Sequence, residues 1–415
     1  MRFSVVLVAS CFLACLAPPA QAQASSTPNP QARFDGVMRK TVSGMEEAYL
    51  PVVEPSSHAA NLLQLKNGDL LCFWFSGVWE GKSGVAIVVS RLRSKSDQWS
   101  KPIVIDRQNG ASFQNPVPFE APDGTIWLIH TTQPANEGQK NARVLVVKSH
   151  DLGRTWTTPQ VLFDVPGAFV RNPIVVRADG AWLLPMYFTP SAGITTDAET
   201  NYSVVKISTD QGGTWSECPI PNSNGYVQPS VVVQSKPKYV AFLRSRFADF
   251  IFRSTSADGC HWTTPKATSL PNNNASIQAV NLKDGRIAIA FNNARAVAPN
   301  GKPATGPRKP LTVALSADGG NTWSAMRNVQ LGTPNKSDDP SYAQLMKDVP
   351  GRDEYSYPSI LQTSDGSIYV AYTFRRQTIK VVRFSESWIG EASDLSRSAL
   401  PQGLVDSIPL LPNRR

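Results

Sequence analysis

The sequence predicts an all-β fold, namely a six-bladed β-propeller of four-stranded antiparallel blades. Short apolar strands that begin at a polar residue, usually followed by Pro, recur six times along the chain. Most of them run into an Asn-Gly or Asp-Gly turn and a second apolar strand, which is the pattern of a β-hairpin. The copies are spaced by about 50 to 60 residues, the length of one propeller blade.

The six strand starts align at one polar residue each. In chain order these residues are His58, Asn115, Asn172, Gln228, Gln278 and Tyr357. Because the innermost strands of a propeller run side by side around its axis, equivalent positions converge on one face. We therefore expect the six side chains to form a polar ring at the mouth of the central channel, where a ligand binds. The alternative is that they only satisfy backbone groups where the channel meets water.

A second motif, Ser-x-Asp-x-Gly-x-Thr-Trp, occurs later in the blades. Three full copies and one shortened copy cover residues 149–156, 208–215, 316–323 and 256–262. The Asp accepts hydrogen bonds from the turn backbone, the Gly takes a conformation that other residues avoid, and the Trp packs between blades. We therefore assign a structural role to the aspartates of this motif, which are Asp151, Asp210, Asp258 and Asp318.

The N-terminal residues predict export. Residues 1–22 have the layout of a cleaved secretory signal, with Arg2 before an apolar run and Ala20-Gln21-Ala22 at its end. We therefore expect a secreted or periplasmic protein. Residues 23–39 are rich in Ser, Pro, Gln and Asn and are expected to form a flexible leader, followed by one propeller domain over residues 40–415.

Cysteine content and hydropathy agree with an exported protein. Cleavage of the signal leaves Cys72, Cys218 and Cys260, which permits one disulfide at most in an oxidising compartment. The apolar run of the signal is too short and wrongly flanked to span a membrane. No later stretch approaches about 18 uninterrupted apolar residues, so no membrane span is expected.

The formal net charge of +9 suits an acidic partner such as an acidic glycan. There is no run of like charges and no basic helix with interleaved aromatic residues, so nucleic acid is not expected as a partner. The four His are scattered, and no Cys/His spacing resembles a metal site. We expect neither a metal nor an organic cofactor.

Across the whole mature chain these motifs resemble the sialidase superfamily, and specifically its branch of BNR-repeat proteins. The repeated Asp motif is similar to the Asp-box of sialidases. The first-blade segments His58-Ala59, Gly68-Asp69-Leu70-Leu71 and Glu80-Gly81 are similar to those of this branch. Residues 354–359 with Asp365-Gly366 resemble the segment that holds the nucleophilic tyrosine of a sialidase, and the resemblance assigns that role to Tyr357.

The resemblance also implies residues that bind the substrate. Sialidases grip the substrate carboxylate with three arginines, because a guanidinium is a planar fork that matches a carboxylate. Arg244, sixteen residues after Gln228, matches the second of them and Arg308 matches the third. His58 takes the place of the first. Arg171 is a further cation of this set.

Two family residues with proton-transfer roles are replaced. The glutamate that helps the tyrosine lose its proton falls on Gln228, which cannot act as a base. The aspartate that serves as acid and base falls on or near Gly84. Glu80 is close in sequence to the missing aspartate, and His58 offers another route for a proton.

His130 is a second histidine that could carry a proton. Asp353 and Glu354 lie just before the tyrosine in sequence. For these two carboxylates a non-catalytic role is favoured.

The sequence thus predicts an exo-acting glycoside hydrolase of the sialidase type, with sialic acid as the leading substrate. The catalytic candidates are Tyr357, Glu80 and His58. The substrate-binding candidates are Arg244, Arg308, Arg171, Asn115, Asn172, Gln228 and Gln278. Two alternatives stay open. One is a hydrolase or lyase for another acidic polysaccharide, such as one with uronic acid, and the other is a non-catalytic glycan-binding propeller that kept the arginines.

Overall fold

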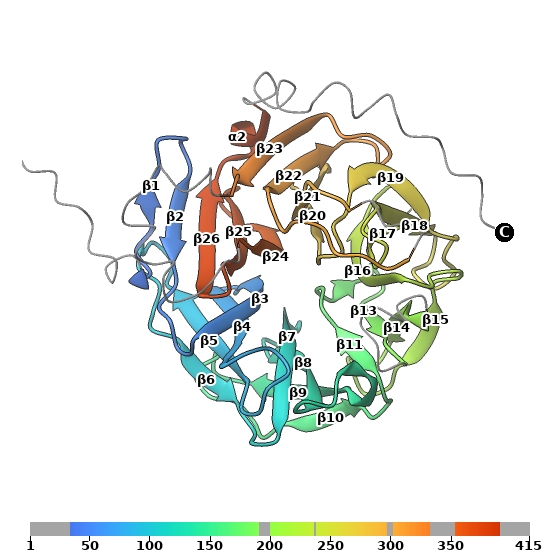
Figure 1. Cartoon of the computed structure of the whole chain (residues 1–415), viewed down its shortest axis with the longest axis horizontal. Coiled ribbons are helices and arrows are strands. Elements are labelled where there is room, and N and C mark those ends of the chain that lie inside the picture. The colour runs from blue at the N-terminus through green and yellow to red at the C-terminus, as the bar shows by residue number, and fades with distance from the viewer. Residues whose placement is uncertain (1–33, 191–199, 236–237, 297–301, 333–352, 391–415) are drawn as a thin grey trace, which may run out of the picture.

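Six β-sheets surround a central axis in the computed structural model, which describes residues 34–190, 200–235, 238–296, 302–332 and 353–390 (Figure 1). Five of the sheets consist of antiparallel strands that follow one another in the chain, and the sixth combines the last three strands with the two N-terminal strands. The predicted six-bladed propeller is therefore confirmed. Residues 1–33, which hold the expected signal and most of the expected leader, lie outside the described residues.

Blades 1 to 3 follow one another along the chain, and their innermost strands face the axis (Figure 1). Their strands are β3 (Ser56–Gln64), β4 (Leu70–Gly77), β5 (Ala86–Leu92), β6 (Ile103–Asp106), β7 (Ala111–Glu120), β8 (Ile126–Pro134), β9 (Arg143–Ser149), β10 (Gln160–Phe163), β11 (Ala168–Val170), β12 (Val175–Val176), β13 (Trp182–Phe188), β14 (Tyr202–Ser208) and β15 (Ser216–Pro219). In blade 3, β11 and β12 together form the innermost strand, because both pair with β13.

Blades 4 to 6 continue the ring. Their strands are β16 (Tyr226–Val233), β17 (Tyr239–Ser245), β18 (Phe250–Ser256), β19 (Lys266–Pro271), β20 (Gln278–Asn281), β21 (Ile287–Asn292), β22 (Leu311–Ser316), β23 (Ala325–Gln330), β24 (Tyr355–Gln362), β25 (Ile368–Phe374) and β26 (Thr378–Phe384). A short 3-10 helix, η2 (Gln139–Asn141), and a short helix, α2 (Glu386–Gly390), complete the described elements.

The N-terminal strands close the ring on blade 6. β2 (Glu46–Tyr49) pairs antiparallel with β26, so that Glu46 lies opposite Arg383, and β1 (Arg39–Lys40) pairs with β2. Strand pairing between the two ends of the chain locks the first blade to the last. The sequence did not predict this closure, and β1 begins at the last residue of the expected leader.

The core lies largely between neighbouring blades. One apolar cluster joins Trp74 and Val88 of blade 1 to Ile379 and Val381 of blade 6. All four side chains are buried, and burial of a large apolar side chain stabilises the fold by about 1.5–3 kcal/mol. Since the blades are held mainly by such packing, they form a rigid frame for the residues at the axis.

The Asp-box motifs close hairpins, as predicted. Asp210 Oδ1 accepts hydrogen bonds from Thr214 N over 2.8 Å and Ser208 Oγ over 2.7 Å. These bonds lower the pKa of Asp210 to about 2. The ring of Trp215 packs edge-on against Phe163 of the preceding blade, with centroids 5.8 Å apart. The aspartates of the motif lie at the hairpin turns and serve the fold.

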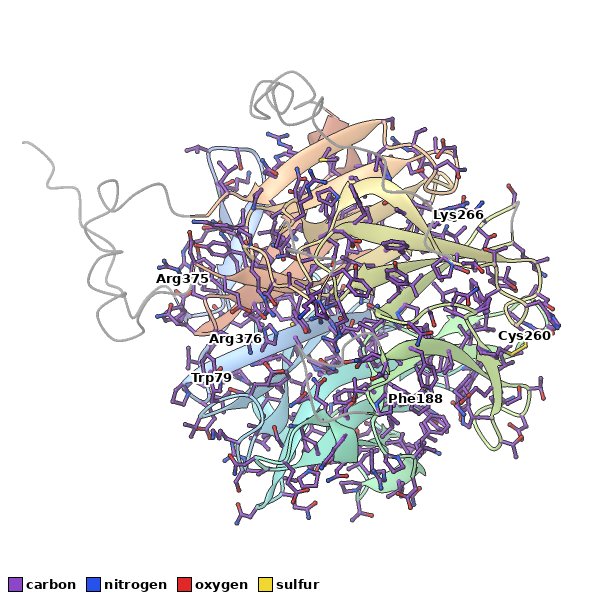
Figure 2. All side chains as sticks on the ribbon, turned by 45° about the vertical axis from the view of Figure 1, so that its right-hand side comes forward. Trp79, Phe188, Cys260, Lys266, Arg375 and Arg376 are labelled. Atoms are coloured by element: carbon purple, nitrogen blue, oxygen red, sulfur yellow. A yellow bond between two sulfur atoms is a disulfide. The ribbon has the colours of Figure 1, made fainter. Side chains whose placement is uncertain are left out.

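One disulfide joins blades 3 and 4. Cys218 of β15 is bonded to Cys260 in the shortened Asp-box, at a Cα–Cα distance of 4.9 Å (Figure 2). Cys72 is buried and carries a free thiol. The single disulfide agrees with the limit that the cysteine count set.

A bulge re-aims the first strand in four blades. Two residues of the strand lie opposite one residue of its neighbour, at 59–60, 115–116, 228–229 and 357–358. The first residue of each pair has a left-handed backbone, with φ of 59° at Ala59, 50° at Asn115, 54° at Gln228 and 53° at Tyr357. Such a conformation is strained for residues other than Gly, and bulges turn a side chain away from its regular direction. The bulges therefore set where these side chains point.

The bulges correct the alignment made from sequence at two positions. Ala59, and not His58, is the equivalent of Tyr357, because it holds the same place in the bulge. Gln278 Oε1 accepts from Ile360 N, in the way that Ser359 Oγ accepts from Leu62 N. Gln278 is thus equivalent to Ser359, two residues beyond the tyrosine position. An inserted bulge residue leaves no mark in a pattern of polar and apolar residues.

Candidate functional site

The hydroxyl of Tyr357 lies against Arg244. Arg244 Nη1 donates a hydrogen bond to Tyr357 Oη over 2.6 Å and another to Gln228 Oε1 over 3.1 Å. Arg244 Nε donates to Asn274 Oδ1 over 2.9 Å. Both side chains are buried, with Arg244 4% exposed and Tyr357 8% exposed. Because three acceptors fix its orientation, the guanidinium presents a positive charge to the phenol oxygen.

The imidazole of His58 packs on the ring of Tyr357, with ring centroids 4.2 Å apart. His58 Nδ1 lies at hydrogen-bond distance, 2.7 Å, from Thr373 Oγ1, while Nε2 is buried without a partner among the described residues. Burial, and then the charges of Arg376 and Arg308, hold the pKa of His58 well below its ordinary value. His58 is therefore neutral at neutral pH and does not replace the charge of an arginine.

Glu354 pairs with two arginines, and its Oε1 also lies 3.8 Å from His58 Nδ1. Its Oε1 accepts hydrogen bonds from Arg308 Nη1 over 2.5 Å and from Arg376 Nε over 3.0 Å. Ser356 Oγ donates to the same carboxylate over 2.8 Å. Burial acts to raise the pKa of Glu354, but the two guanidinium groups outweigh it and lower the pKa to about 2. Glu354 stays ionised and provides a fixed negative charge.

Glu80 lies at the more exposed edge of the site. Its Oε2 accepts a hydrogen bond from Arg376 Nη1 over 2.8 Å, and its side chain is 32% exposed. The guanidinium of Arg376 also lies 5.5 Å from the ring centre of Trp79, and Figure 2 shows the two residues close together. The side chain of Arg308 is 20% exposed. Glu80 and Arg308 are thus more exposed than Arg376 and Glu354.

Two buried tyrosines near Arg244 differ in acidity. Burial raises the pKa of Tyr187 to about 12. Burial also acts to raise the pKa of Tyr357, but the charges of Arg244 and Arg308 outweigh it, so that this pKa lies below the ordinary value. A phenol with a lowered pKa is the better nucleophile at neutral pH. Tyr357 is thus the tyrosine that its surroundings activate.

Arg246 is a further buried cation that the sequence reasoning missed. It is 2% exposed, and its charge acts on Tyr357. The sequence signal was the two arginines of Arg244-Ser245-Arg246 at the end of an apolar strand, because alternate residues of an extended chain share a face.

The residues around the phenol described so far form what we call the tyrosine cluster: Tyr357, His58, Gln228, Arg244, Arg246, Arg308, Glu354, Arg376 and Glu80.

Solved sialidases share this fold. NanB sialidase from Streptococcus pneumoniae has a TM-score of 0.63 at 14% identity, over 81% of this chain and 69% of that chain. The intramolecular trans-sialidase from Ruminococcus gnavus has a TM-score of 0.60 at 14% identity, over 82% of this chain and 97% of that chain. A protein of unknown function from Dyadobacter fermentans has a TM-score of 0.62 at 17% identity, over 83% and 98% of the two chains. At such identities the likeness concerns the fold.

The family is decided by the sequence itself. The BNR repeat-like domain matches residues 68–370, which is most of the chain. The chain belongs to the BNR repeat-like family. No curated protein matches this BNR repeat-like protein at a significant level.

In this BNR repeat-like protein, Arg171 lies beside Tyr357, with its guanidinium carbon 5.5 Å from the ring centroid. It donates to the carbonyl oxygens of Ala60, Tyr357 and Pro358, over 3.2, 3.0 and 3.0 Å, and to Ser276 Oγ over 3.0 Å. These partners come from three blades. Arg171 therefore links these blades at the axis, and the hydrogen-bond donors of its guanidinium already have acceptors within the protein.

Asn172 and Gln278 belong to the same axial network. Asn172 Nδ2 donates to the carbonyl oxygens of Gln228 and Pro229 over 2.9 and 3.1 Å. Gln278 Nε2 donates to Asn61 Oδ1 over 3.0 Å, and its Oε1 accepts from Ser359 Oγ over 2.8 Å. Both side chains are buried, and their contacts are those of the structural alternative considered from sequence.

Asn115 and Gly84 are the remaining positions that the sequence singled out near the site. Asn115 is 5% exposed and holds the bulge position of blade 2. Gly84, where the family aspartate falls, has a φ of 77°, and a Cβ added there meets no atom within 4 Å. The backbone at Gly84 therefore borders open space.

His130 lies outside the tyrosine cluster. Its Nε2 is 3.0 Å from Asp106 Oδ2, and its ring packs against Phe113, between blades 1 and 2. In the part of the chain that the structure describes, no group of three or more His, Cys, Asp or Glu is placed to hold a metal ion. The same residues include no helix long and apolar enough to cross a membrane.

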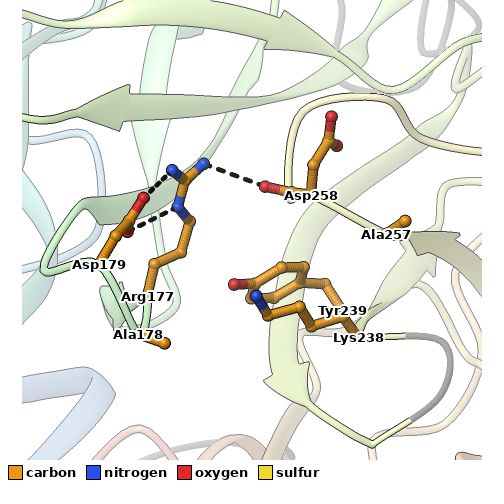
Figure 3. A pocket seen from close by; sticks show the side chains of 7 residues that line it. All are labelled: Arg177, Ala178, Asp179, Lys238, Tyr239, Ala257 and Asp258. Carbon is orange, nitrogen blue, oxygen red and sulfur yellow. Dashed lines mark hydrogen bonds and ion pairs between the residues drawn. The ribbon is translucent and has the colours of Figure 1, made fainter.

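A pocket of about 430 Å³ lies at the rim between blades 3 and 4 (Figure 3). Arg177 Nε donates to Asp179 Oδ1 over 3.0 Å, and its Nη1 donates to the carbonyl oxygen of Asp258 over 3.1 Å. Tyr239 at this pocket and Arg244 in the tyrosine cluster lie toward opposite ends of β17. The rim pocket is thus separate from the tyrosine cluster.

Proposed function

We propose that this protein is a glycoside hydrolase that removes an acidic sugar from a glycan, with Tyr357 as its nucleophile. The observation that carries the proposal is the 2.6 Å hydrogen bond from Arg244 to the Tyr357 hydroxyl, together with the lowered pKa of that tyrosine. Arginine charge favours the tyrosinate and so supplies what the absent family glutamate would otherwise do.

The proposed reaction has two steps. The Tyr357 oxygen attacks the anomeric carbon, the bond from that carbon to the leaving oxygen breaks, and the leaving oxygen takes a proton. Water then attacks the same carbon, loses a proton and releases Tyr357. We assign both proton transfers to Glu80, because it is the carboxylate at the exposed edge of the cluster, whereas Glu354 stays ionised.

Sialic acid is the leading substrate, and a uronic acid is the second choice. The support is the excess of arginine around the tyrosine, since a guanidinium pairs well with a carboxylate. The names of the structural neighbours, a sialidase and a trans-sialidase, favour the first.

A second candidate function is non-catalytic binding of acidic glycans. One observation favours it: Gln228, which cannot act as a base, holds the place expected for a glutamate and contacts Arg244 over 3.1 Å. Both candidates predict binding, and only the first predicts turnover.

Sugar release from fluorogenic sialosides and uronides separates the two. The expected result is turnover of one class by the wild type and loss of turnover in Tyr357→Phe, with an unchanged melting temperature. Turnover by Tyr357→Phe at the wild-type rate removes the tyrosine from the mechanism. Binding of acidic sugars without turnover of any of them favours the second candidate.

We further propose that the protein is exported to the periplasm or the medium. Support comes from the layout of residues 1–22 and from the Cys218–Cys260 disulfide, since disulfides persist in oxidising compartments. Fractionation of cells that express the full chain tests this, and recovery of uncleaved protein in the cytoplasm contradicts it.

A further inference from the structure

Arg246 is held inside the site by its backbone. Its N–H donates to the carbonyl oxygen of Gly225 over 2.8 Å, and its own carbonyl oxygen accepts from Ala304 N over 3.1 Å. It follows directly after β17, two residues beyond Arg244. The backbone thus fixes a second arginine next to the one that contacts the tyrosine.

The guanidinium of Arg246 is buried and largely unsatisfied. Its Nε and Nη2 have no hydrogen-bond partner among the described residues. Burial, and then the charge of Arg244, lower the pKa of Arg246 to about 10, so it is still a cation at neutral pH. A buried charge without a partner is costly, and most proteins avoid it. Arg246 therefore has the properties of a residue that binds an anionic ligand.

The net charge around the tyrosine also indicates a site for an anion. Within the described parts of the chain, five buried or half-buried arginines face two carboxylates, which leaves three positive charges without a countercharge. The arginines are Arg171, Arg244, Arg246, Arg308 and Arg376, and the carboxylates are Glu354 and Glu80.

Each of the other arginines has a partner. Arg308 and Arg376 share the carboxylate of Glu354, and Arg171 donates to carbonyl oxygens at the axis. Arg244 faces the Tyr357 hydroxyl and favours its ionised form. Of the five, Arg246 is the one whose Nε and Nη2 have no hydrogen-bond partner of any kind among the described residues.

We propose that Arg246 binds the acidic group of the substrate and that the site takes a sugar with one carboxylate. This inference rests on the proposed function and names the residue that recognises the substrate. In this chain the carboxylate is then held next to the tyrosine by the pair Arg244 and Arg246 of a single blade. That pair makes up for the neutral His58 in the place where the family has an arginine.

Calorimetric titration with N-acetylneuraminic acid and with glucuronic acid tests the inference. We expect the wild type to bind at least one of these acids and not N-acetylglucosamine, which is neutral. Arg246→Gln should weaken binding of that acid by about 10- to 100-fold, as for the loss of a charge-assisted contact. Arg246→Lys, which keeps the charge, should recover part of the affinity.

Arg253→Gln is the matched control. Arg253 belongs to the same blade, and its Nε donates to the carbonyl oxygen of Gly319 over 2.8 Å, away from the tyrosine cluster. Its replacement should leave sugar binding unchanged. Without ligand, Arg246→Gln should melt no lower than the wild type, because the substitution removes an unpaired buried charge.

The outcomes separate this inference from the proposed function. If the wild type binds an acidic sugar and Arg246→Gln binds it equally well, Arg246 is not the anchor, while the proposed function stands. If the wild type binds neither acid, the proposed function and this inference both fail. Should Arg246→Gln not fold, Arg246→Lys decides, since unchanged affinity in a folded lysine variant overturns the assignment.

Discussion

Arg244 donates a hydrogen bond to the hydroxyl of Tyr357 over 2.6 Å, although 113 residues separate the two in the chain. β17 of blade 4 carries the arginine, and the bulge of blade 6 carries the tyrosine. Only the closed ring brings them together. The acidity of the tyrosine is therefore a property of the assembled propeller.

Replacement of Arg244 should raise the pKa of Tyr357. The charge of Arg244 is the strongest influence that lowers this pKa, and Arg244→Gln removes it. The measurement is ultraviolet titration of phenolate, with Tyr357→Phe as the blank that isolates this tyrosine. Since the tyrosinate is the active form, turnover should rise with pH, and its rise should move to higher pH in Arg244→Gln. A titration that does not move contradicts the role of Arg244.

Glu354→Gln should destabilise the fold and acidify Tyr357 further. The substitution leaves Arg308 and Arg376 buried without their shared countercharge, and the loss of one partner of a buried pair costs about 3–5 kcal/mol. Chemical denaturation measures the first effect and phenolate titration the second. Unchanged stability would contradict the role of Glu354 as their shared countercharge.

The stability from Glu354 should vanish in acid. Its pKa is about 2 in the folded protein and 4.5 for a glutamate free of such partners, so the contribution is fully present above pH 4.5. It is lost as the pH falls through 2. The stability difference between the wild type and Glu354→Gln should therefore shrink over this range, and a constant difference contradicts the ion pairs.

Asp210→Ala should lower the melting temperature by a few degrees without a selective loss of chemistry. The aspartate accepts hydrogen bonds in its hairpin and lies on the rim, away from Tyr357. Because its pKa falls from 3.8 to about 2 on folding, the difference from the wild type should disappear as the pH drops through this window. A normal melting temperature with dead catalysis contradicts the structural role.

Replacement of Cys218 and Cys260 by Ser should lower stability by roughly 4 kcal/mol, because the disulfide closes a loop of 42 residues. The bond lies in the outer parts of blades 3 and 4, so turnover below the melting transition should stay at the wild-type level. Denaturation of the double variant beside the wild type provides the measurement. A loss of activity in a folded double variant would tie the disulfide to the site.

The fold was predicted from local sequence patterns. Each hairpin turn and Asp-box is a short signal, so repetition along the chain was enough to predict six blades. The ring closure was missed because Glu46–Tyr49 is a four-residue strand whose partner, β26, lies at the other end of the chain. No local pattern indicates such a pairing.

Only part of the candidate site was predicted, because contacts between distant segments leave no local sequence pattern. The resemblance led to Tyr357, Arg244 and Arg308, which the structure places in one cluster. For Glu354 the sequence favoured a non-catalytic role but gave no sign of its surroundings, and in the structure it is 5% exposed between two arginines. Burial and partners of this kind depend on contacts between blades and are invisible in the sequence.

The central claim is that Tyr357 attacks an acidic sugar. An activated sialoside or uronide that carries fluorine beside the anomeric carbon slows the second step and lets the covalent intermediate accumulate. Peptide mass spectrometry then locates the attached sugar. The proposal predicts one sugar on the peptide that contains Tyr357, and none in Tyr357→Phe. Turnover with the sugar attached to a different residue, or with the same label in Tyr357→Phe, would contradict it.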